Sequence, residues 1–165
     1  MTDWRRRLGS ATCAGVAAAW LLGLPAWPGE ADVPYPEGYR SWVHVKSTLV
    51  GPSAPGFATN GGLHHFYANE KALEGYRTGR FPDGAVLIDD LLELTEKGGV
   101  GSEGARKRLA VMVKQSSKFP ETGGWGFEVF KADGTVGSLN AEARAACFKC
   151  HSGAPRESVF SELRK

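Results

Sequence analysis

The chain has 165 residues, of which 42% are hydrophobic and 23% charged, and its formal net charge is +2. This length suits one domain with a real core. Because positive and negative side chains are nearly balanced, neither nucleic acid nor an anionic membrane surface is an expected partner.

The first 31 residues have the pattern of a secretory signal peptide. Three arginines at 5–7 form a positive start, and residues 11–27 are apolar and rich in alanine. Small residues before the start of the next segment predict cleavage after Ala31, with Ala26 as the weaker alternative. An uncleaved anchor is less favoured, because two prolines break an apolar stretch shorter than the about 20 residues of a membrane span. We therefore expect one periplasmic domain over residues 32–165.

The first half of the predicted domain contains two strands followed by one helix. Residues 42–50 alternate and are rich in β-branched side chains, which predicts a strand. A loop rich in Gly, Pro, Ser and Asn is expected over 51–62, and a short strand over 63–67. Asn69 is a good N-cap for a helix over 70–77.

The second half is predicted to hold three strands and then two helices. After a Pro-Asp-Gly turn the strands are expected at 85–94, 109–113 and 125–130. Helices are expected at 140–150 and at 155–163, the second with proline at its first position. Strands with helices segregated at one end indicate an α+β fold with a mostly antiparallel sheet.

The strongest chemical signal is the run Cys147-Phe148-Lys149-Cys150-His151. It has the C-x-x-C-H pattern that attaches a c-type haem. Two thiols at this spacing can add to the two vinyl groups along one porphyrin edge, and the following histidine can bind the iron from below. We therefore expect one covalent haem c on Cys147 and Cys150, with His151 as the iron ligand.

Other uses of these cysteines fit less well. Zinc needs four ligands, usually from two paired clusters, and a thioredoxin-like dithiol needs a βαβ context. Cys13 is the third cysteine and falls in the predicted signal. Both remaining thiols are committed to haem, so no structural disulfide is expected.

Four blocks of the sequence resemble the cytochrome P-460 and cytochrome c′-beta family. They are PEGYRSWVHVKS (36–47), GLHHFYANEKALEGYRTGRFPDGAVLIDDLLE (62–93), ETGGWGFEVF (121–130) and CFKCHSGAPRESVFSELR (147–164). The resemblance implies a mostly antiparallel β-sheet, a periplasmic location, a homodimer and five-coordinate haem iron. One branch of the family cross-links a lysine to the porphyrin and oxidises hydroxylamine. The other lacks that link, has an apolar distal pocket and binds nitric oxide.

The resemblance places Asp89 at the position of the cross-linking lysine. A carboxylate cannot supply the amine of that link, so no lysine–porphyrin bond is expected. Strand alternation puts Asp89 on one face with apolar neighbours, where a carboxylate is costly unless it is paired or protonated. One hypothesis makes Asp89 a distal acid that moves protons at the haem. The alternative places it outward on an exposed strand, with Asp90 inward.

Several other side chains are candidates for the haem site. Consecutive strand residues face opposite ways, so at most one of His64 and His65 can face the haem. His64 is preferred, because it matches a distal arginine of the lysine-linked branch. Met112 is the one candidate for a sulfur ligand to the iron, although filling the core of its strand is the favoured interpretation. Lys46 and Lys114 are expected to be solvated charges.

Trp125 and Phe127 follow two glycines and face the same side of a predicted strand. The simpler interpretation is an aromatic core at the entry of a strand. The resemblance favours a more specific one, in which both rings form an apolar wall of the haem pocket.

The leading functional hypothesis is a periplasmic mono-haem c-type cytochrome with an open iron site. It binds nitric oxide or a similar small ligand and takes part in nitrogen-oxide redox chemistry. One alternative is an enzyme, either a hydroxylamine or nitrogen-oxide oxidoreductase or a peroxidase-like protein, with Asp89 and His64 as acid–base groups. A further alternative is a simple electron carrier with a strong sixth ligand. A periplasmic redox partner and a second copy of the chain are the expected protein partners.

Overall fold

The computed structural model of the protein describes residues 33–164. The predicted signal peptide lies outside the described residues, so its cleavage after Ala31 stays a prediction. Within residues 33–164, no helix combines the length and the apolar character needed to cross a membrane.

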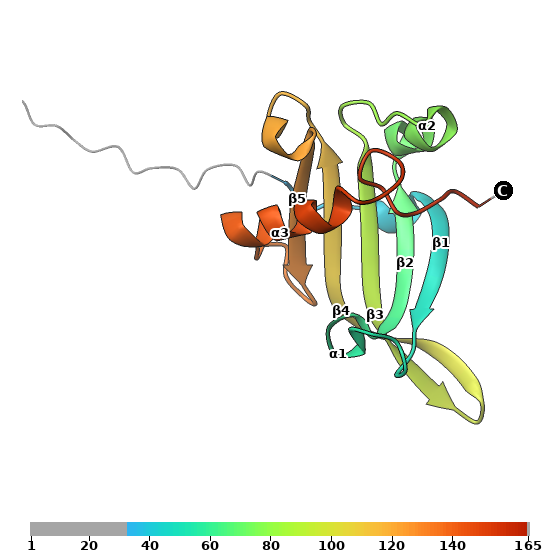
Figure 1. The fold of residues 1–165 in the computed structure, drawn as a ribbon. Helices are drawn as coiled ribbons and strands as arrows, with labels where there is room; N and C mark the ends of the chain where they lie inside the picture. The colour runs from blue at the N-terminus through green and yellow to red at the C-terminus, as the bar shows by residue number, and fades with distance from the viewer. Residues whose placement is uncertain (1–32, 165) are drawn as a thin grey trace, which may run out of the picture.

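One antiparallel sheet of five strands forms the frame, and each strand pairs with its neighbours in sequence (Figure 1). The strands are β1 (Val43–Val50), β2 (Gly62–Ala68), β3 (Val86–Lys97), β4 (Val100–Lys114) and β5 (Trp125–Lys131). The helical elements are η1 (Tyr39–Ser41), α1 (Phe57–Asn60), α2 (Glu70–Thr78), η2 (Pro120–Thr122) and α3 (Ala141–His151). The predicted α+β class, with a mostly antiparallel sheet and a C-terminal helix carrying the C-x-x-C-H motif, is confirmed.

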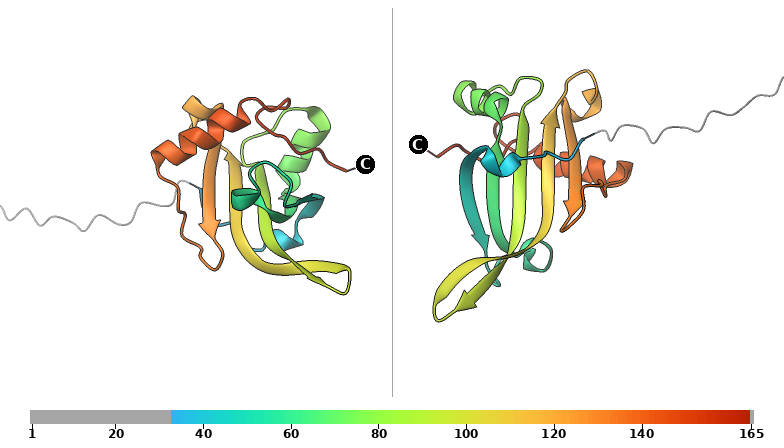
Figure 2. Two further views of the ribbon diagram at one scale, coloured as in Figure 1. Left: turned by 60° about the horizontal axis from the view of Figure 1, so that its bottom comes forward. Right: turned by 180° about the vertical axis from the view of Figure 1, so that it is seen from behind.

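The two faces of the sheet support different clusters, because side chains alternate along each strand. On one face Ala68, Leu87, Met112 and Phe127 form a row across four strands. Helix α3 and the C-terminal stretch cover this face (Figure 1). The N-terminal stretch with η1 covers the other face, where it packs around Ile88 (Figure 2).

Asn69 joins helix α2 to strand β3. Its side-chain oxygen accepts hydrogen bonds from the backbone N–H of Ala72 at 2.9 Å and of Val86 at 3.0 Å. Its side-chain nitrogen donates to the Gly84 carbonyl at 2.9 Å. The predicted N-cap is confirmed, and the same side chain also fixes where β3 begins.

We expect Asn69→Ala to lower the free energy of unfolding by about 2 kcal/mol, because it removes a helix cap and leaves two further backbone groups without this partner. Asn140 caps α3 through one bond to the Ala143 N–H, at 2.9 Å. Asn140→Ala is therefore the matched control, with an expected loss of about 1 kcal/mol. Chemical denaturation of both haem-loaded variants measures the difference, and equal losses would show that the bonds to β3 contribute nothing.

The β3–β4 hairpin is longer than predicted. Strand β4 begins at Val100, whereas the sequence pattern predicted a strand only over 109–113. The missed part belongs to an arm that projects beyond the rest of the sheet (Figure 1). Most of its side chains are exposed, so it has no apolar alternation to reveal it. Gly98 and Gly99, with φ of 61° and 80°, supply the left-handed backbone of the hairpin turn.

The predictions for two segments outside the sheet, 51–62 and 155–163, were wrong. The segment 51–62 contains the one-turn helix α1. The predicted helix at 155–163 does not form, and a tight turn lies there instead, closed by the Val159 N–H donating to the Arg156 carbonyl at 2.9 Å. Its central residues Glu157 and Ser158 have φ of 44° and 70°, which a right-handed helix does not allow. Long-range hydrogen bonds from Phe81 and Trp125 hold this turn.

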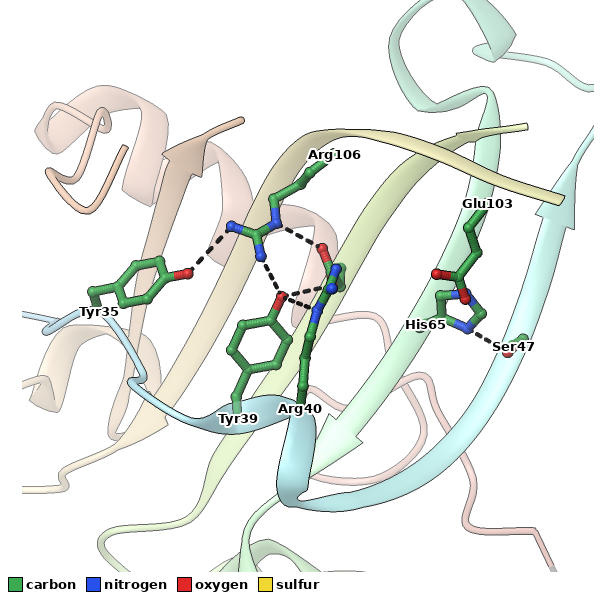
Figure 3. Close-up of polar contacts among 8 residues, drawn as sticks. Tyr35, Tyr39, Arg40, Ser47, His65, Glu103 and Arg106 are labelled. Atoms are coloured by element: carbon green, nitrogen blue, oxygen red, sulfur yellow. Dashed lines mark hydrogen bonds and ion pairs between the residues drawn. The ribbon is translucent and has the colours of Figure 1, made fainter. Parts of the chain in front are cut away.

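Asp90 lies at the centre of a polar network on the face away from α3. Its side chain is fully buried and accepts hydrogen bonds from Tyr39 at 2.5 Å, Arg40 at 2.9 Å and Arg106 at 3.1 Å. Figure 3 shows how Arg106 also reaches the hydroxyls of Tyr39 and Tyr35. Burial, assisted by the bond to Asp90, raises the pKa of Tyr39 to about 12, so the phenol keeps its proton and donates it.

Candidate functional site

A cavity of about 440 Å³ lies between the sheet and the C-terminal part of the chain. The sheet side contributes Phe66, Leu87, Asp89, Ala110, Met112 and Phe127, and the C-terminal side contributes Cys147, Cys150, His151, Val159 and Phe160. This volume falls within the range of about 300–1,000 Å³ that is usual for cofactor sites. The walls are mostly apolar, so a bound group would be shielded from water.

Helix α3 brings the three residues of the motif to the same space. Cys147, Cys150 and His151 are separated by three and four positions, which places them on one face of a helix. Asn140 starts the helix, and the last turn ends at His151 itself. Burial raises the pKa of the Cys147 thiol, which therefore stays protonated at neutral pH.

The His151 ring is oriented by a backbone carbonyl and by two aromatic rings. Its Nδ1 lies 2.8 Å from the Ser158 carbonyl oxygen, and because a carbonyl can only accept, Nδ1 carries the proton. In the neutral ring Nε2 then holds the lone pair that can bind a metal. Phe127 and Phe160 flank the ring, with centroids 5.3 Å and 5.2 Å away.

The sheet wall of the cavity includes one row of neighbouring residues from four strands. Phe66, Asp89, Ala110 and Val129 form one row across β2 to β5. Ala110 is small, so space remains beside the Asp89 carboxylate. Met112 was predicted to fill the core of its strand; it packs half-buried against the core cluster on this face and also lines the cavity.

Asp89 in this wall pairs with His64, which lies outside the cavity lining and 25 positions away in sequence. The His64 Nδ1 lies 2.8 Å and 3.1 Å from the two carboxylate oxygens of Asp89. The Nε2 of the same ring lies 2.8 Å from the Asn60 carbonyl, at the end of α1. Asp89 therefore lines the cavity with a partner, and the alternative of an exposed Asp89 does not hold.

The hydrogen bonds of His64 determine how many protons the pair carries. Nε2 must donate to the Asn60 carbonyl, so the contact between Nδ1 and Asp89 holds one further proton. The bond to Asp89 is the main cause that raises the pKa of His64, against the opposing effect of burial. The two contacts of His64 thus favour an imidazolium paired with a carboxylate.

His65 points to the other face of the sheet, which agrees with the prediction that only one of the two neighbouring histidines faces the cavity. Its Nδ1 lies 2.7 Å from the Ser47 hydroxyl, and its Nε2 lies 2.8 Å from a Glu103 carboxylate oxygen (Figure 3).

Phe127 and Trp125 have different positions, although both face the α3 side of β5. Phe127 lines the cavity, whereas Trp125 lies outside its lining and is buried against Phe81. Lys114 was predicted to be a solvated charge, but only 8% of the residue is exposed. Its ammonium donates to the Gly123 carbonyl at 2.9 Å and lies over the Trp125 ring. These contacts replace those with water, so the charge can be buried.

The comparisons with known proteins agree with this geometry. A sequence model of the cytochrome P460 family matches residues 36–161. The chain belongs to the cytochrome P460 family. No curated protein matches it as a relative. Membership implies a haem cofactor for this cytochrome P460, and it confirms the resemblance inferred from the four sequence blocks.

The residues around the cavity fit a haem in this cytochrome P460. Two thiols and an imidazole with its Nε2 lone pair come from one helix face, and the walls beside them are apolar and aromatic. Cys147 and Cys150 would hold the porphyrin edge, and His151 would hold the iron.

Two parts of the site had no signal in the sequence. The Asn60 carbonyl fixes His64, and the Ser158 carbonyl fixes His151. Both are backbone groups in loops, and any residue type carries a carbonyl. The Arg156–Val159 turn lacks the glycine or asparagine that usually marks a left-handed backbone.

Proposed function

We propose that this cytochrome P460 is a periplasmic mono-haem c-type protein that binds nitric oxide or a similar small nitrogen oxide. One observation carries the proposal: Cys147, Cys150 and His151 line the same cavity as Asp89, and His64 holds the Asp89 carboxylate from behind. Haem c supplies an iron centre that takes up a small ligand and exchanges electrons. The apolar walls formed by Phe66, Leu87 and Phe127 exclude water and favour a small, weakly polar ligand.

The Asp89–His64 pair gives the cavity a proton that can be shared with a ligand. Asp89 lines the cavity, and His64 supports it from behind through Nδ1 while its Nε2 is tied to Asn60. The pair is close to neutral as a whole, so it costs less to bury than a lone carboxylate. If the Nδ1 proton of His64 passes to the Asp89 carboxylate, Asp89 can donate it to a bound nitrogen oxide and stabilise the negative charge that develops there.

The second candidate function is an enzyme that oxidises hydroxylamine or another nitrogen oxide, or that reacts with peroxide. The Asp89 carboxylate in the cavity wall favours it, because such reactions need a proton acceptor next to the reacting atoms. The chain offers Asp89 where the hydroxylamine-oxidising branch of the family has its cross-linking lysine, so we rank this candidate second.

The haem attachment is tested by mass spectrometry under denaturing conditions. We expect the wild-type protein, purified from the periplasm, to weigh its chain from Asp32 onward plus one haem, because two thioether bonds survive unfolding. The double variant C147S/C150S should lose the haem into acidified acetone. Haem loss from the wild type in the same extraction would refute c-type attachment.

The open iron site is tested by optical spectra of the ferric and ferrous protein. We expect high-spin spectra of ordinary haem c, without the red shift of a lysine-linked chromophore. Met112 lies in the cavity wall and is the residue that could act as a sixth ligand. Met112→Leu should therefore leave both spectra unchanged. A low-spin wild type that becomes high-spin in this variant would instead establish an electron carrier.

From the family resemblance we propose that the protein forms a homodimer. We also propose that this dimer exchanges electrons with a periplasmic redox protein. Sedimentation of the haem-loaded protein tests the dimer, and a single monomeric species at micromolar concentration would exclude it.

A further inference from the structure

The turn that follows the haem motif has an unfavourable backbone. Among residues 33–164, Glu157 and Ser158 are the two non-glycine residues with positive φ, at 44° and 70°. Side chains with a Cβ disfavour this conformation, and two such residues in succession are kept only where the surroundings hold them.

Three contacts from separate parts of the fold hold Glu157. The Phe81 backbone N–H donates to its carboxylate at 2.8 Å, and the indole N–H of Trp125 donates to its carbonyl at 2.8 Å. The ammonium of Lys114 lies 3.8 Å from the carboxylate. Trp125 and Lys114 are buried at the end of the sheet, so they form a rigid support.

The next residue in the turn contacts the predicted iron ligand. The Ser158 carbonyl accepts the hydrogen bond from His151 Nδ1 at 2.8 Å. A change in the backbone of Glu157 would rotate this carbonyl away, because the two residues share the same strained turn. The contacts that hold Glu157 therefore act on the His151 imidazole through the neighbouring Ser158 carbonyl.

We propose that Glu157, supported by Trp125 and Phe81, is a positioning residue that sets the strength of His151 as an iron ligand. The proposal rests on the proposed haem attachment but not on the proposed chemistry of Asp89 and His64. A hydrogen bond at Nδ1 makes an imidazole a stronger electron donor and fixes its ring plane. Stronger donation stabilises the oxidised iron and lowers its reduction potential.

The test compares four variants of the haem-loaded protein. Trp125→Phe keeps the aromatic ring but removes the N–H that binds the Glu157 carbonyl. Glu157→Ala removes the acceptor for the Phe81 N–H, and Glu157→Gln restores an acceptor oxygen. Trp42→Phe is the matched control, because Trp42 packs in the cluster on the other face of the sheet.

Two readouts are taken at equal haem content: the midpoint reduction potential and the ferrous iron–histidine stretching frequency from resonance Raman spectra. We expect Trp125→Phe and Glu157→Ala to raise the potential and lower the frequency. Glu157→Gln and Trp42→Phe should keep both wild-type values.

Wild-type values in both Trp125→Phe and Glu157→Ala would overturn the proposal. If one of these variants fails to incorporate haem, the other decides. Failure of both would also overturn it, because Glu157 would then serve folding and not ligand strength. A wild type without covalent haem refutes the proposed function instead, so the two failures are distinguishable.

Discussion

Asp89→Asn is expected to release nitric oxide about 10 to 100 times faster than the wild type. The substitution keeps the size of the side chain but removes the shared proton, and a hydrogen bond to a charged group contributes about 1.5–3 kcal/mol. It also removes the main cause that raises the pKa of His64. The pH dependence of ligand release should therefore move to lower pH in the variant.

The sign of this pH effect follows from the pair. Because the folded-state pKa of His64 is raised above its ordinary value of about 6.5, the pair stabilises the folded protein fully below that pH. This contribution is lost as the pH rises through the raised pKa. Wild-type ligand release should accelerate in the same interval above about pH 6.5, and thermal unfolding should show a parallel loss of stability.

Stopped-flow release rates, measured across the pH range for wild type and variant, test this prediction. Asp133→Asn is the control, because Asp133 is an exposed carboxylate in the loop after β5. The same rates and the same pH profile in Asp89→Asn and wild type would show that the pair does not act on the ligand.

Asp90→Ala is expected to give the largest loss of stability, about 3–5 kcal/mol, because removing one partner of a buried ion pair leaves the other partners uncompensated. Arg40, Arg106 and Tyr39 all donate to Asp90. The Arg40 side chain is 54% exposed and regains water, which favours the lower end of this range. We expect the melting temperature to fall by on the order of 10–20 °C.

Calorimetry of the haem-loaded protein measures this effect. Asp90→Asn retains one acceptor oxygen and should lose less stability than Asp90→Ala. Asp133→Ala, at an exposed position, should stay within about 0.5 kcal/mol of the wild type. A melting temperature of Asp90→Ala close to that of the control would contradict a structural role for the network. Covalent haem should remain in every variant, since Asp90 lies on the face away from the cavity.

The adjacent carboxylates Asp89 and Asp90 illustrate how strand geometry separates two roles. Side chains alternate along β3, so one carboxylate enters the cavity and the other enters the network with Tyr39 and the arginines. A shift of one residue in the register of β3 would exchange them. The sequence alone left this choice open, because the residues two positions before and after each carboxylate are apolar.

Local patterns in the sequence determined much of this protein. The alternation of β1, the cap Asn69 before α2, and the C-x-x-C-H run at the end of α3 are short-range features, and each was predicted correctly as an element or motif. The opposite orientation of His64 and His65 also followed, because the two-residue period of a strand depends on nothing outside the strand.

Only the tertiary structure decided which groups meet. The Asp89–His64 pair, the burial of Lys114 and the support of Glu157 by Trp125 each join residues from different elements. The turn at Glu157 and Ser158 formed where the local pattern predicted a helix, because the bonds from Trp125, Phe81 and His151 outweigh a weak helical preference. Local propensity is worth tenths of a kcal/mol per residue, whereas several hydrogen bonds to buried partners together exceed it.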